Sequence, residues 1–457
     1  MMGVLAQTSA TWTEVLEILT FRSGWNAGVV LIGTTMLGIS AGLIGTFSLL
    51  RNRALMGDAL SHATLPGVCV MFMVLVALGH SGRSVGLLLL GAAASGIVGV
   101  LTVQAITRFS RVREDAAIGI VLSVFFGVGV VLLSRIQSMQ VGTQGGLSHF
   151  ILGQTAGMSS RDAAIMGVVA VLSMASSLLL LKEFRVICFD RVFAQAQGWP
   201  VQMLDLLLMG LVVVVTVVGI QAVGMLLIVA LLIIPPAAAR FWTDRLVVMV
   251  VLSGVIGGVS GYLGVVASSV WSDMPAGAVI VLVSGAIFLV SFVLAPRRGV
   301  IANVVAHLRL RVRIACDHVL RLMLESTGVE RDASKVTDRR VHVSQIERAR
   351  VWSALTLRLT LWLLRLRGLL RREGAYLALT RAGAVDAERV TRNHRLWERF
   401  LVTHADLAVS HVDRAADMVE HVLSPEMVAR LEREVSLDGA MPVSVHEISH
   451  EPSEGGA

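Results

Sequence analysis

Long apolar runs separated by short basic segments fill the first two thirds of the chain. Eight of these runs approach the roughly 20 residues that a helix needs to cross a membrane, and they cover 28–50, 64–79, 84–106, 116–134, 163–181, 204–221, 246–270 and 276–295. A shorter run at 224–239 contains Pro235 and Pro236 near its end, so it predicts either a full span or a broken, re-entrant one. The pattern predicts an all-α polytopic membrane region with about nine transmembrane helices.

Basic residues set the expected orientation of these spans. They cluster at Arg51/Arg53, Arg108/Arg111/Arg113, Lys182/Arg185/Arg191, Arg240/Arg245 and Arg297/Arg298. The segments near 80–83, 135–160 and 272–275 carry few basic residues. Because basic loops stay in the cytoplasm, nine spans put residues 1–27 outside the cell and everything after 297 inside. With eight spans the alternation of basic loops fails, which favours nine. The expected location is the cell (inner) membrane, with several passes.

Charge density divides the chain into two unlike parts. Residues 1–296 carry 25 of the 71 charged side chains, and 297–457 carry the other 46. The second part therefore has the charge density of a soluble domain. The net charge of +7 does not by itself indicate nucleic-acid binding. Cys69, Cys188 and Cys316 are widely separated, which predicts no disulfide framework and fits a reducing interior.

The segment 57–67, Gly-Asp-Ala-Leu-Ser-His-Ala-Thr-Leu-Pro-Gly, places an acid and an imidazole between two apolar runs. Asp58 and His62 stand at i and i+4, so on a helix they share a face and offer one oxygen and one nitrogen ligand. Ionisable groups at membrane depth are costly and usually mark an ion or substrate path. In the structural alternative, Asp58 caps a helix and His62 hydrogen-bonds inside a bundle. We favour the ion path.

This segment resembles the hallmark of the metal-ion ABC permease family, which imports manganese, zinc or ferrous iron. The stretch 223–235 resembles a second pattern of that family. The resemblance implies that Asp58 and His62 hold the ion in transit and that an extracytoplasmic metal-binding lipoprotein delivers it. It also implies a second permease copy or paralogue. A mixed oxygen and nitrogen site suits Mn(II), Fe(II) or Zn(II) and cannot choose among them. No permanently bound cofactor is expected.

The chain has no ATP-binding loop of its own. It contains only two lysines, Lys182 and Lys335, and neither follows a glycine as the phosphate-binding motif requires. We therefore expect a transport subunit that is not an enzyme, with a separate cytoplasmic ATPase. The segment 189–198 resembles the family's coupling element, Phe-Asp-x-x-x-Ala-x-x-x-Gly. The resemblance implies that this ATPase seats on Phe189, Asp190, Ala194 and Gly198. Asp190 is expected to cap the short helix.

The charged part of the chain predicts a connecting helix followed by a small domain. Residues 297–342 form an arginine-rich helix and a linker, and 343–435 a mainly helical domain resembling a winged helix. Within it, 371–383 predicts two short strands around Gly374 and a helix capped by Thr380. The tail 436–457 is polar and predicted to be disordered. Residues 28–296 form the membrane domain.

Five oxygen and nitrogen donors stand at helical spacing in the small domain. Asp417, Glu420 and His421 occupy i, i+3 and i+4, and His394 and Glu398 occupy i and i+4. Such a set predicts a transition-metal site on two adjacent helices. The segment resembles the dimerisation and metal-sensing domain of the DtxR/MntR repressors. That resemblance implies that His394, Glu420 and His421 are ligands, that His394 and Glu398 form a further pair, and that Asp417 favours manganese over iron as the regulatory ion.

Three functions stay open at this point. The first is an ATP-driven importer of divalent metal, manganese first, with a cytoplasmic metal-responsive domain. The second is a zinc or ferrous-iron permease. The third, of another class, is a membrane-anchored metal-dependent transcription regulator. The segment 351–370 is more apolar than a usual recognition helix, which disfavours DNA binding without excluding it. A domain that dimerises or reports internal metal is favoured over DNA binding and over a vestigial domain.

Overall fold

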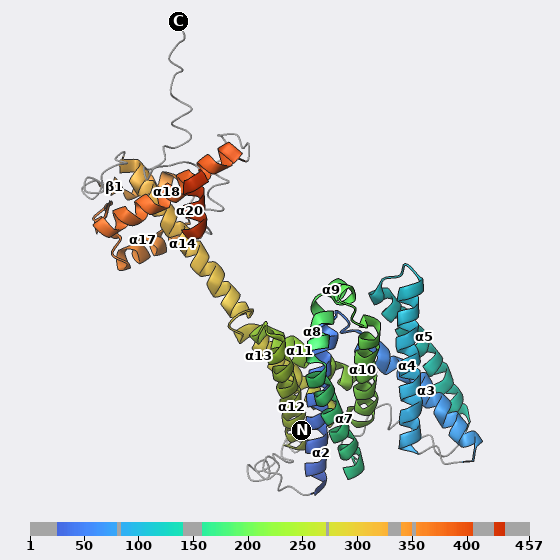
Figure 1. The fold of residues 1–457 in the computed structure, drawn as a ribbon. Coiled ribbons are helices and arrows are strands. Elements are labelled where there is room, and N and C mark those ends of the chain that lie inside the picture. Colours follow the sequence, from blue (N-terminus) through green and yellow to red (C-terminus); the bar gives the residue numbers. More distant parts are fainter. Residues whose placement is uncertain are drawn as a thin grey trace, which may run out of the picture. The chain divides into compact units, whose positions relative to one another are not determined.

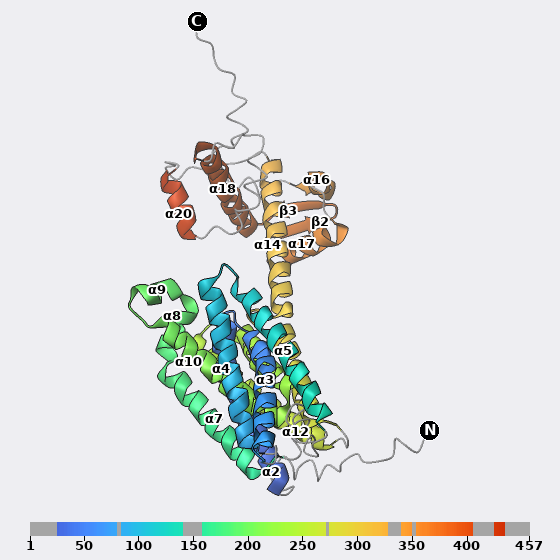
Figure 2. The same ribbon diagram turned by 90° about the vertical axis from the view of Figure 1, so that its right-hand side faces the viewer.

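The computed structural model describes residues 25–79, 84–139, 158–270, 274–327, 340–349, 353–404 and 425–434. The chain divides into two compact units, Met1–Asn303 and Val304–Ala457, and both are mainly helical (Figure 1, Figure 2). The predicted N-terminal segment and the predicted disordered tail lie almost entirely outside the described residues. The finer domain boundaries stay predictions.

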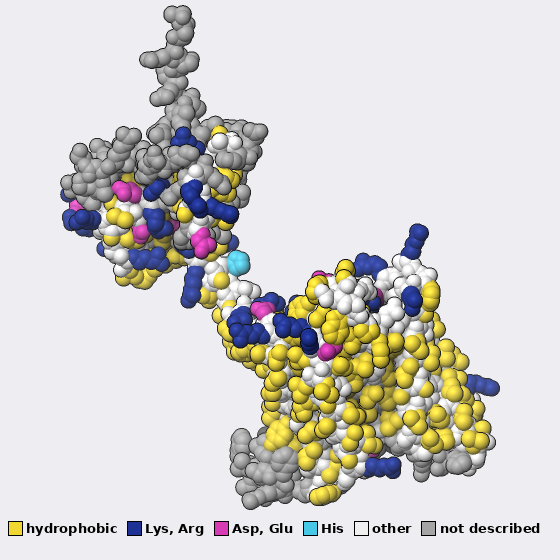
Figure 3. All heavy atoms as spheres, in the orientation of Figure 1, with side chains coloured by type: hydrophobic (Ala, Val, Ile, Leu, Met, Phe, Trp, Pro, Cys, Tyr) yellow, Lys and Arg dark blue, Asp and Glu magenta, His cyan; other side chains and the backbone are white. Residues whose placement is uncertain are grey.

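The first unit is a bundle of long apolar helices. Eight of them are long and apolar enough to cross a membrane, and the flank of the unit is largely hydrophobic (Figure 3), as a surface in contact with lipid must be. They are α2 (Trp25–Leu50), α3 (Met56–Ala77), α4 (Val85–Phe109), α5 (Glu114–Ser138), α7 (Ser160–Leu179), α10 (Val201–Val223), α12 (Leu246–Val270) and α13 (Ala276–Leu294). The polytopic α-helical fold predicted from the sequence is confirmed.

A ninth apolar helix, α11 (Met225–Trp242), is shorter than these eight. At its start, a Cβ placed on Gly277 of α13 would lie 2.1 Å from Cδ2 of Leu227. Past its other end, Nη1 of Arg297, which follows α13, lies 3.8 Å from Oδ2 of Asp244. Both ends of α11 are therefore level with the ends of α13. This placement supports a full crossing by α11 and a count of nine spans.

Glycines let the helices of this unit pack backbone against backbone. A Cβ on Gly38 of α2 would lie 2.1 Å from the carbonyl oxygen of Gly257 in α12, and the reverse contact is the same. Gly67 of α3 and Gly91 of α4 meet in a similar way, at 2.1 and 2.6 Å. Small residues at such positions are the usual means of close helix approach in membranes, so both pairs of helices are tightly joined.

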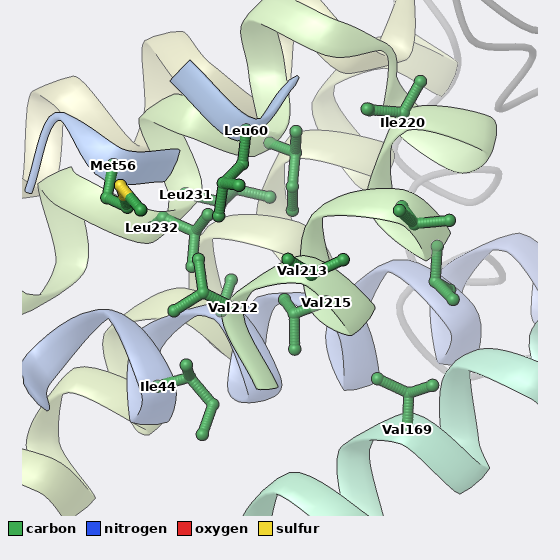
Figure 4. Close-up of a cluster of buried hydrophobic side chains, with 14 of the residues drawn as sticks. Ile44, Met56, Leu60, Val169, Val212, Val213, Val215, Ile220, Leu231 and Leu232 are labelled. Carbon is green, nitrogen blue, oxygen red and sulfur yellow. The ribbon is translucent and has the colours of Figure 1, made fainter. Parts of the chain in front are cut away.

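Branched and aliphatic side chains fill the centre of the bundle, where α2, α3, α7, α10 and α11 meet (Figure 4). The side chains in that view include Ile44, Leu60, Val169, Val213 and Leu231, all buried. Because the core is shared by helices from across the sequence, it fixes α3 in place. That helix carries the candidate metal ligands.

The second unit combines helices with a small antiparallel sheet. Its helices are the greater part of α14 (Val300–Thr327), then α16 (Val343–Ala349), α17 (Ala354–Leu366), α18 (Arg381–His404) and α20 (Pro425–Glu434). The strands are β1 (Val341–His342), β2 (Leu370–Glu373) and β3 (Tyr376–Leu379), in the order β1-β3-β2. This arrangement is winged-helix-like, as predicted.

Local chemistry explains the hairpin and the helix after it. Gly374 turns the chain between β2 and β3 with φ of 66°, a conformation that glycine adopts without strain. Thr380 Oγ1 then accepts a hydrogen bond from the Gly383 amide at 3.0 Å, which caps the start of α18. The predicted strand pair and the Thr380 cap are confirmed.

Candidate metal sites and coupling network

The α3 pair, Asp58 and His62, lies one helical turn apart on one face of α3. His62 Nε2 is 3.6 Å from Asp58 Oδ1, and the side chains are 21% and 36% exposed. This distance is too long for a hydrogen bond, so neither group is satisfied by the other. Within the described structure, Nδ1 of His62 is buried without a hydrogen-bond partner. The residue preceding α3 is Leu55, and it makes no side-chain cap, so the alternative in which Asp58 is the N-cap is wrong.

His62 lies beside the central parts of the neighbouring helices, and Asp58 lies one turn nearer the start of α3. The His62 ring meets the Phe126 ring edge-on, with centroids 4.9 Å apart, and Phe126 is halfway along α5. Beside it, the Ala63 carbonyl accepts a hydrogen bond from Ser95 Oγ at 2.6 Å, and Ser95 lies in the central part of α4. Ionisable side chains at such depth are expensive and rare. Their presence here points to function rather than to packing.

The spacing of the α3 pair is close to that of two ligands on one metal ion. Ligands about 2.1 Å from a common ion lie about 3.0–3.4 Å apart in octahedral or tetrahedral geometry. Nε2 and Oδ1 reach this range with a shift of a few tenths of an ångström. Across the described ranges, no three His, Cys, Asp or Glu side chains form a cluster. The α3 pair therefore offers two ligands, and the rest of a coordination shell must come from elsewhere.

The predicted coupling residues lie in and around a short helix on the basic side. It is α9 (Arg191–Ala196), which follows α8 (Leu181–Phe189). Asp190 Oδ1 accepts a hydrogen bond from the Phe193 amide at 2.8 Å, so the predicted cap is present. Ala194 is buried. Gly198, in the turn after α9, has a positive φ of 79°. Phe189 is 67% exposed. Large exposed apolar side chains of this kind suit a partner surface.

A buried carboxylate connects this element to the turn before α3. Asp205 of α10 is 2% exposed, and Nη2 of Arg51 lies 2.8 Å from both of its oxygens. Arg53 and Arg191 each bring a nitrogen to 3.5 Å from Oδ2 of Asp205. Arg53 also pairs with Glu114 at the start of α5. We call these five residues the Asp205 network.

The Asp205 network ties four segments together. Arg51 and Arg53 belong to the turn that leads into α3, and Arg191 belongs to α9. Arg51 Nη1 additionally donates to the Ile187 carbonyl of α8 at 3.1 Å. Buried ion pairs hold their geometry strictly because removing one partner leaves an uncompensated charge. These contacts therefore join α8 and α9 directly to the turn before α3. The sequence analysis missed this network, although an acid inside the apolar run 204–221 was the available signal.

The α18 pair, His394 and Glu398, has the same spacing along its helix. His394 Nε2 lies 3.1 Å from Glu398 Oε1, and both side chains are buried. Nη1 of Arg321, on α14, lies 2.7 Å from Nδ1 of His394. The other predicted ligands of this domain, Asp417, Glu420 and His421, lie outside the described residues.

The cysteines outside the membrane helices are poorly suited to hold a metal. Burial raises the pKa of the Cys188 thiol to about 12. Burial also raises the pKa of the Cys316 thiol, although Arg367 opposes the shift. A metal ligand must be the thiolate, which is scarce at both positions near neutral pH. Burial therefore disfavours the thiolate form of both groups.

The helix that stands where a winged helix has its recognition helix, α17, has an apolar exposed face. On α17, Leu355, Leu359, Trp362 and Leu366 are 72%, 46%, 56% and 65% exposed. Recognition helices place polar side chains against base edges in the major groove. The exposed stripe of α17 differs from that composition.

Residues 27–295 match the family model described as the ABC 3 transport family. This chain belongs to that family. Residues 380–436 of the permease match a second model, the iron dependent repressor metal binding and dimerisation domain. The permease therefore joins a transport domain to a metal-sensor-type domain, as the two resemblances predicted.

The permease is similar to named metal transport proteins. It is 35% identical over 446 residues to the manganese transport system membrane protein MntC of Bacillus subtilis, covering 95% of this chain and 98% of that one. The zinc transport system membrane protein TroC of Treponema pallidum is 43% identical over 272 residues, covering 60% and 90%. Among solved structures, PsaBC from Streptococcus pneumoniae in complex with Fab matches with a TM-score of 0.54 and 32% identity, covering 63% of this chain and 98% of that chain.

Proposed function

We propose that this permease is the transmembrane subunit of an ATP-driven importer of divalent transition metal, with manganese as the first candidate and zinc or ferrous iron as the alternatives. The α3 pair carries the proposal. Oδ1 of Asp58 and Nε2 of His62 lie 3.6 Å apart on one face of the membrane-spanning helix α3. At this distance the two atoms do not form a hydrogen bond with each other. A cation passing between them would satisfy both groups.

Manganese is preferred among the metals because of a relative that aligns along almost the whole of this chain. That relative, aligned over 446 residues, is named for manganese transport. Ligand chemistry alone does not identify the ion. A given site binds Zn(II) more tightly than Mn(II), but the availability of each metal in the cell decides which one occupies the site. The zinc-named relative aligns over 272 residues, 60% of this chain. Zinc is therefore the main alternative.

A second permease copy or paralogue is proposed to close the path. Asp58 is 36% exposed within a transmembrane helix, one turn from His62. A charged group facing lipid inside a membrane would be strongly unfavourable. Phe126 and Val128 of the neighbouring α5 are 41% and 49% exposed. This apolar face supports a partner packed over α3 and α5.

ATP-driven movement is proposed to enter through α8 and α9. The exposed Phe189 and the capped α9 form the surface for a separate ATPase subunit, as the family pattern implies. The Asp205 network then joins α9 to the turn before α3, so that ATPase closure shifts the α3 pair. On the other side of the membrane, a metal-binding lipoprotein is proposed to deliver the ion.

The second unit is proposed to be a cytoplasmic domain that responds to internal Mn(II) or Fe(II). Its match to a repressor-type metal-binding and dimerisation domain supports this role. The proposed ligands are His394, Glu398, Asp417, Glu420 and His421. The winged-helix-like sheet keeps a membrane-anchored transcription regulator as an alternative. The apolar face of α17 weighs against DNA binding, so control of transport is preferred.

Uptake of radioactive manganese tests the transport proposal. Cells carrying the permease with its ATPase and lipoprotein should accumulate the ion, and Asp58→Asn or His62→Ala should reduce uptake more than about tenfold, since each removes half of the paired ligands. Asp115→Asn, an exposed carboxylate at the start of α5, is the matched control. Uptake at the wild-type rate by both α3 variants would reject the site. Stronger competition by zinc than by manganese would reverse the metal preference.

A further inference from the structure

Arg321 places a cation against the α18 pair. Nη1 of Arg321 lies 2.7 Å from Nδ1 of His394, and Nε2 on the other side of the ring lies 3.1 Å from Oε1 of Glu398. All three side chains are buried. The contact joins α14 to α18 through one imidazole ring.

The chemistry of these three groups fixes where the imidazole proton lies. A guanidinium group only donates hydrogen bonds and stays charged in proteins. Nδ1 of His394 therefore accepts from Arg321, and the proton of the neutral ring lies on Nε2, where it is donated to Glu398. Arg321 faces Glu398 across the ring, and its Nε lies 3.5 Å from Oε1 of the half-exposed Glu325 on its own helix. In this state each ring nitrogen of His394 has a hydrogen-bond partner.

The same two atoms fit a divalent metal ion. The 3.1 Å between Nε2 and Oε1 is within the spacing of about 3.0–3.4 Å that two ligands of one ion adopt. Coordination through Nε2 uses the lone pair of that nitrogen, so the proton of the neutral ring must move to Nδ1. A metal-bound histidine donates this other proton to an acceptor. Arg321 offers only N–H groups there, so its contact with His394 and metal binding through Nε2 exclude each other.

We propose that Arg321 is a built-in competitor for the regulatory metal ion. This inference rests on the metal-responsive role proposed above for the second unit. When internal metal is scarce, Arg321 occupies Nδ1 and holds His394 in the tautomer that cannot bind metal through Nε2. Apparent affinity falls with the fraction of molecules in which the ring is free. Arg321 thereby sets the metal concentration at which the domain responds.

Because Arg321 and His394 lie on different helices, the competition changes a contact between those helices. Arg321 lies on α14, the helix that follows the last membrane helix in the sequence, and His394 lies on α18 within the repressor-type segment. Release of Arg321 removes a buried hydrogen bond between these two helices. Apolar contacts of α14 within the second unit, through Cys316 and Leu320, stay in place. Metal binding therefore loosens one specific contact of α14 without unfolding the unit.

Manganese titration of the full-length permease in detergent tests the inference. Asp58→Asn with His62→Ala removes the α3 pair, so that loss of the free-ion paramagnetic resonance signal reports other sites. In that background, Arg321→Met keeps much of the apolar stem and removes the charge. The dissociation constant should fall roughly ten- to hundredfold, the range for one buried hydrogen bond to a charged group. Arg311→Met, an exposed arginine on the same helix, should leave it unchanged.

The outcomes separate the inference from the proposal on which it rests. Saturable binding with equal affinity in the parent and in Arg321→Met overturns the role of Arg321 and leaves metal sensing standing. Absence of saturable binding in both overturns metal sensing and the competitor together. Should Arg321→Met fold poorly, hydrogen exchange in the unaltered permease decides. Manganese should then speed amide exchange in the part of α14 around Arg321, and unchanged or slower exchange there overturns the inference.

Discussion

The permease contains two histidine–carboxylate pairs with identical helical spacing in opposite surroundings. In the α3 pair the atoms stand 3.6 Å apart and are partly exposed. In the α18 pair they stand 3.1 Å apart, are buried, and are contacted by Arg321. Spacing along the chain cannot distinguish these cases. What distinguishes the two pairs is the neighbour of the histidine ring, which is Phe126 at His62 and the cation Arg321 at His394.

This difference suits the two proposed roles. A pair that carries an ion through a membrane must bind and release it quickly, so groups left without a mutual hydrogen bond are an advantage. A pair that reports concentration must stay empty until a threshold is reached. An internal cation provides such a threshold because the metal must displace it. The predictions that follow test this contrast.

The largest effect is expected from placing a cation beside the α3 pair. Phe126 packs edge-on against His62, so Phe126→Arg brings a guanidinium to the same ring and makes this pair resemble the other. Manganese uptake should fall more than about tenfold, because ion and guanidinium repel in a site of low polarity. Phe126→Leu should keep most of the uptake.

Val128→Arg controls for the cost of inserting an arginine into the exposed face of α5. Membrane levels of each variant are compared by immunoblot. Equal uptake by Phe126→Arg and Phe126→Leu at equal protein level would contradict the contrast between the two pairs.

Asp205→Asn should uncouple metal transport at the α3 pair from ATP hydrolysis. The change leaves Arg51, Arg53 and Arg191 without their shared buried carboxylate, and such uncompensated charges are strongly unfavourable. We expect uptake to fall about tenfold while ATP hydrolysis by the assembled transporter continues, and manganese binding by the second unit should be unaffected. Parallel measurement of uptake and phosphate release in proteoliposomes checks this. A proportional loss of both activities would instead indicate failed assembly.

Substitution in the α18 pair should lower the stability of its unit more than substitution in the α3 pair does, although the α3 pair matters more for transport. Glu398→Gln breaks a buried, hydrogen-bonded group and should destabilise the second unit by about 3 kcal/mol. Asp58→Asn changes a partly exposed group that has no direct hydrogen bond to His62, so the first unit should lose less than about 1 kcal/mol. Pulse proteolysis of the full-length permease, with fragments assigned to each unit, measures both changes. Similar losses in the two units would remove the distinction.

The smallest expected effect concerns metal preference. His62→Asp turns the α3 pair into an all-oxygen pair, which suits manganese better than zinc. Zinc should compete with manganese uptake a few-fold less well in this variant. Competition curves at fixed manganese concentration provide the measurement. An unchanged inhibition constant would mean that His62 does not contact the ion.

Local and periodic features of the molecule could be predicted from the sequence. Apolar runs predicted the membrane helices, and the turn glycine Gly374 with the Thr380 cap predicted the hairpin and the start of α18. Helical spacing placed Asp58 with His62 and His394 with Glu398. Each of these features depends on residues that are close together in the chain, where backbone preferences and side-chain spacing act directly.

The third partners could not be predicted in the same way. Arg51 reaches Asp205 across 154 residues, and Arg321 reaches His394 across 73. Arg321 is one of many arginines in its segment, and only folding shows that it is buried. Which arginine meets a given acid or imidazole depends on tertiary packing. The sequence therefore located the candidate ligands and missed the groups that control them.

The glycine contacts of the bundle constrain how it can change shape. Where Gly38 meets Gly257 and Gly67 meets Gly91, no side chains separate the backbones, so neither pair of helices can ratchet along its partner. We expect α2 with α12 and α3 with α4 to turn as stiff plates, with bending confined to the joints between plates. His62 and Asp58 lie on the α3–α4 pair, so we expect them to move with that pair as it rotates, without any sliding of α3 along α4.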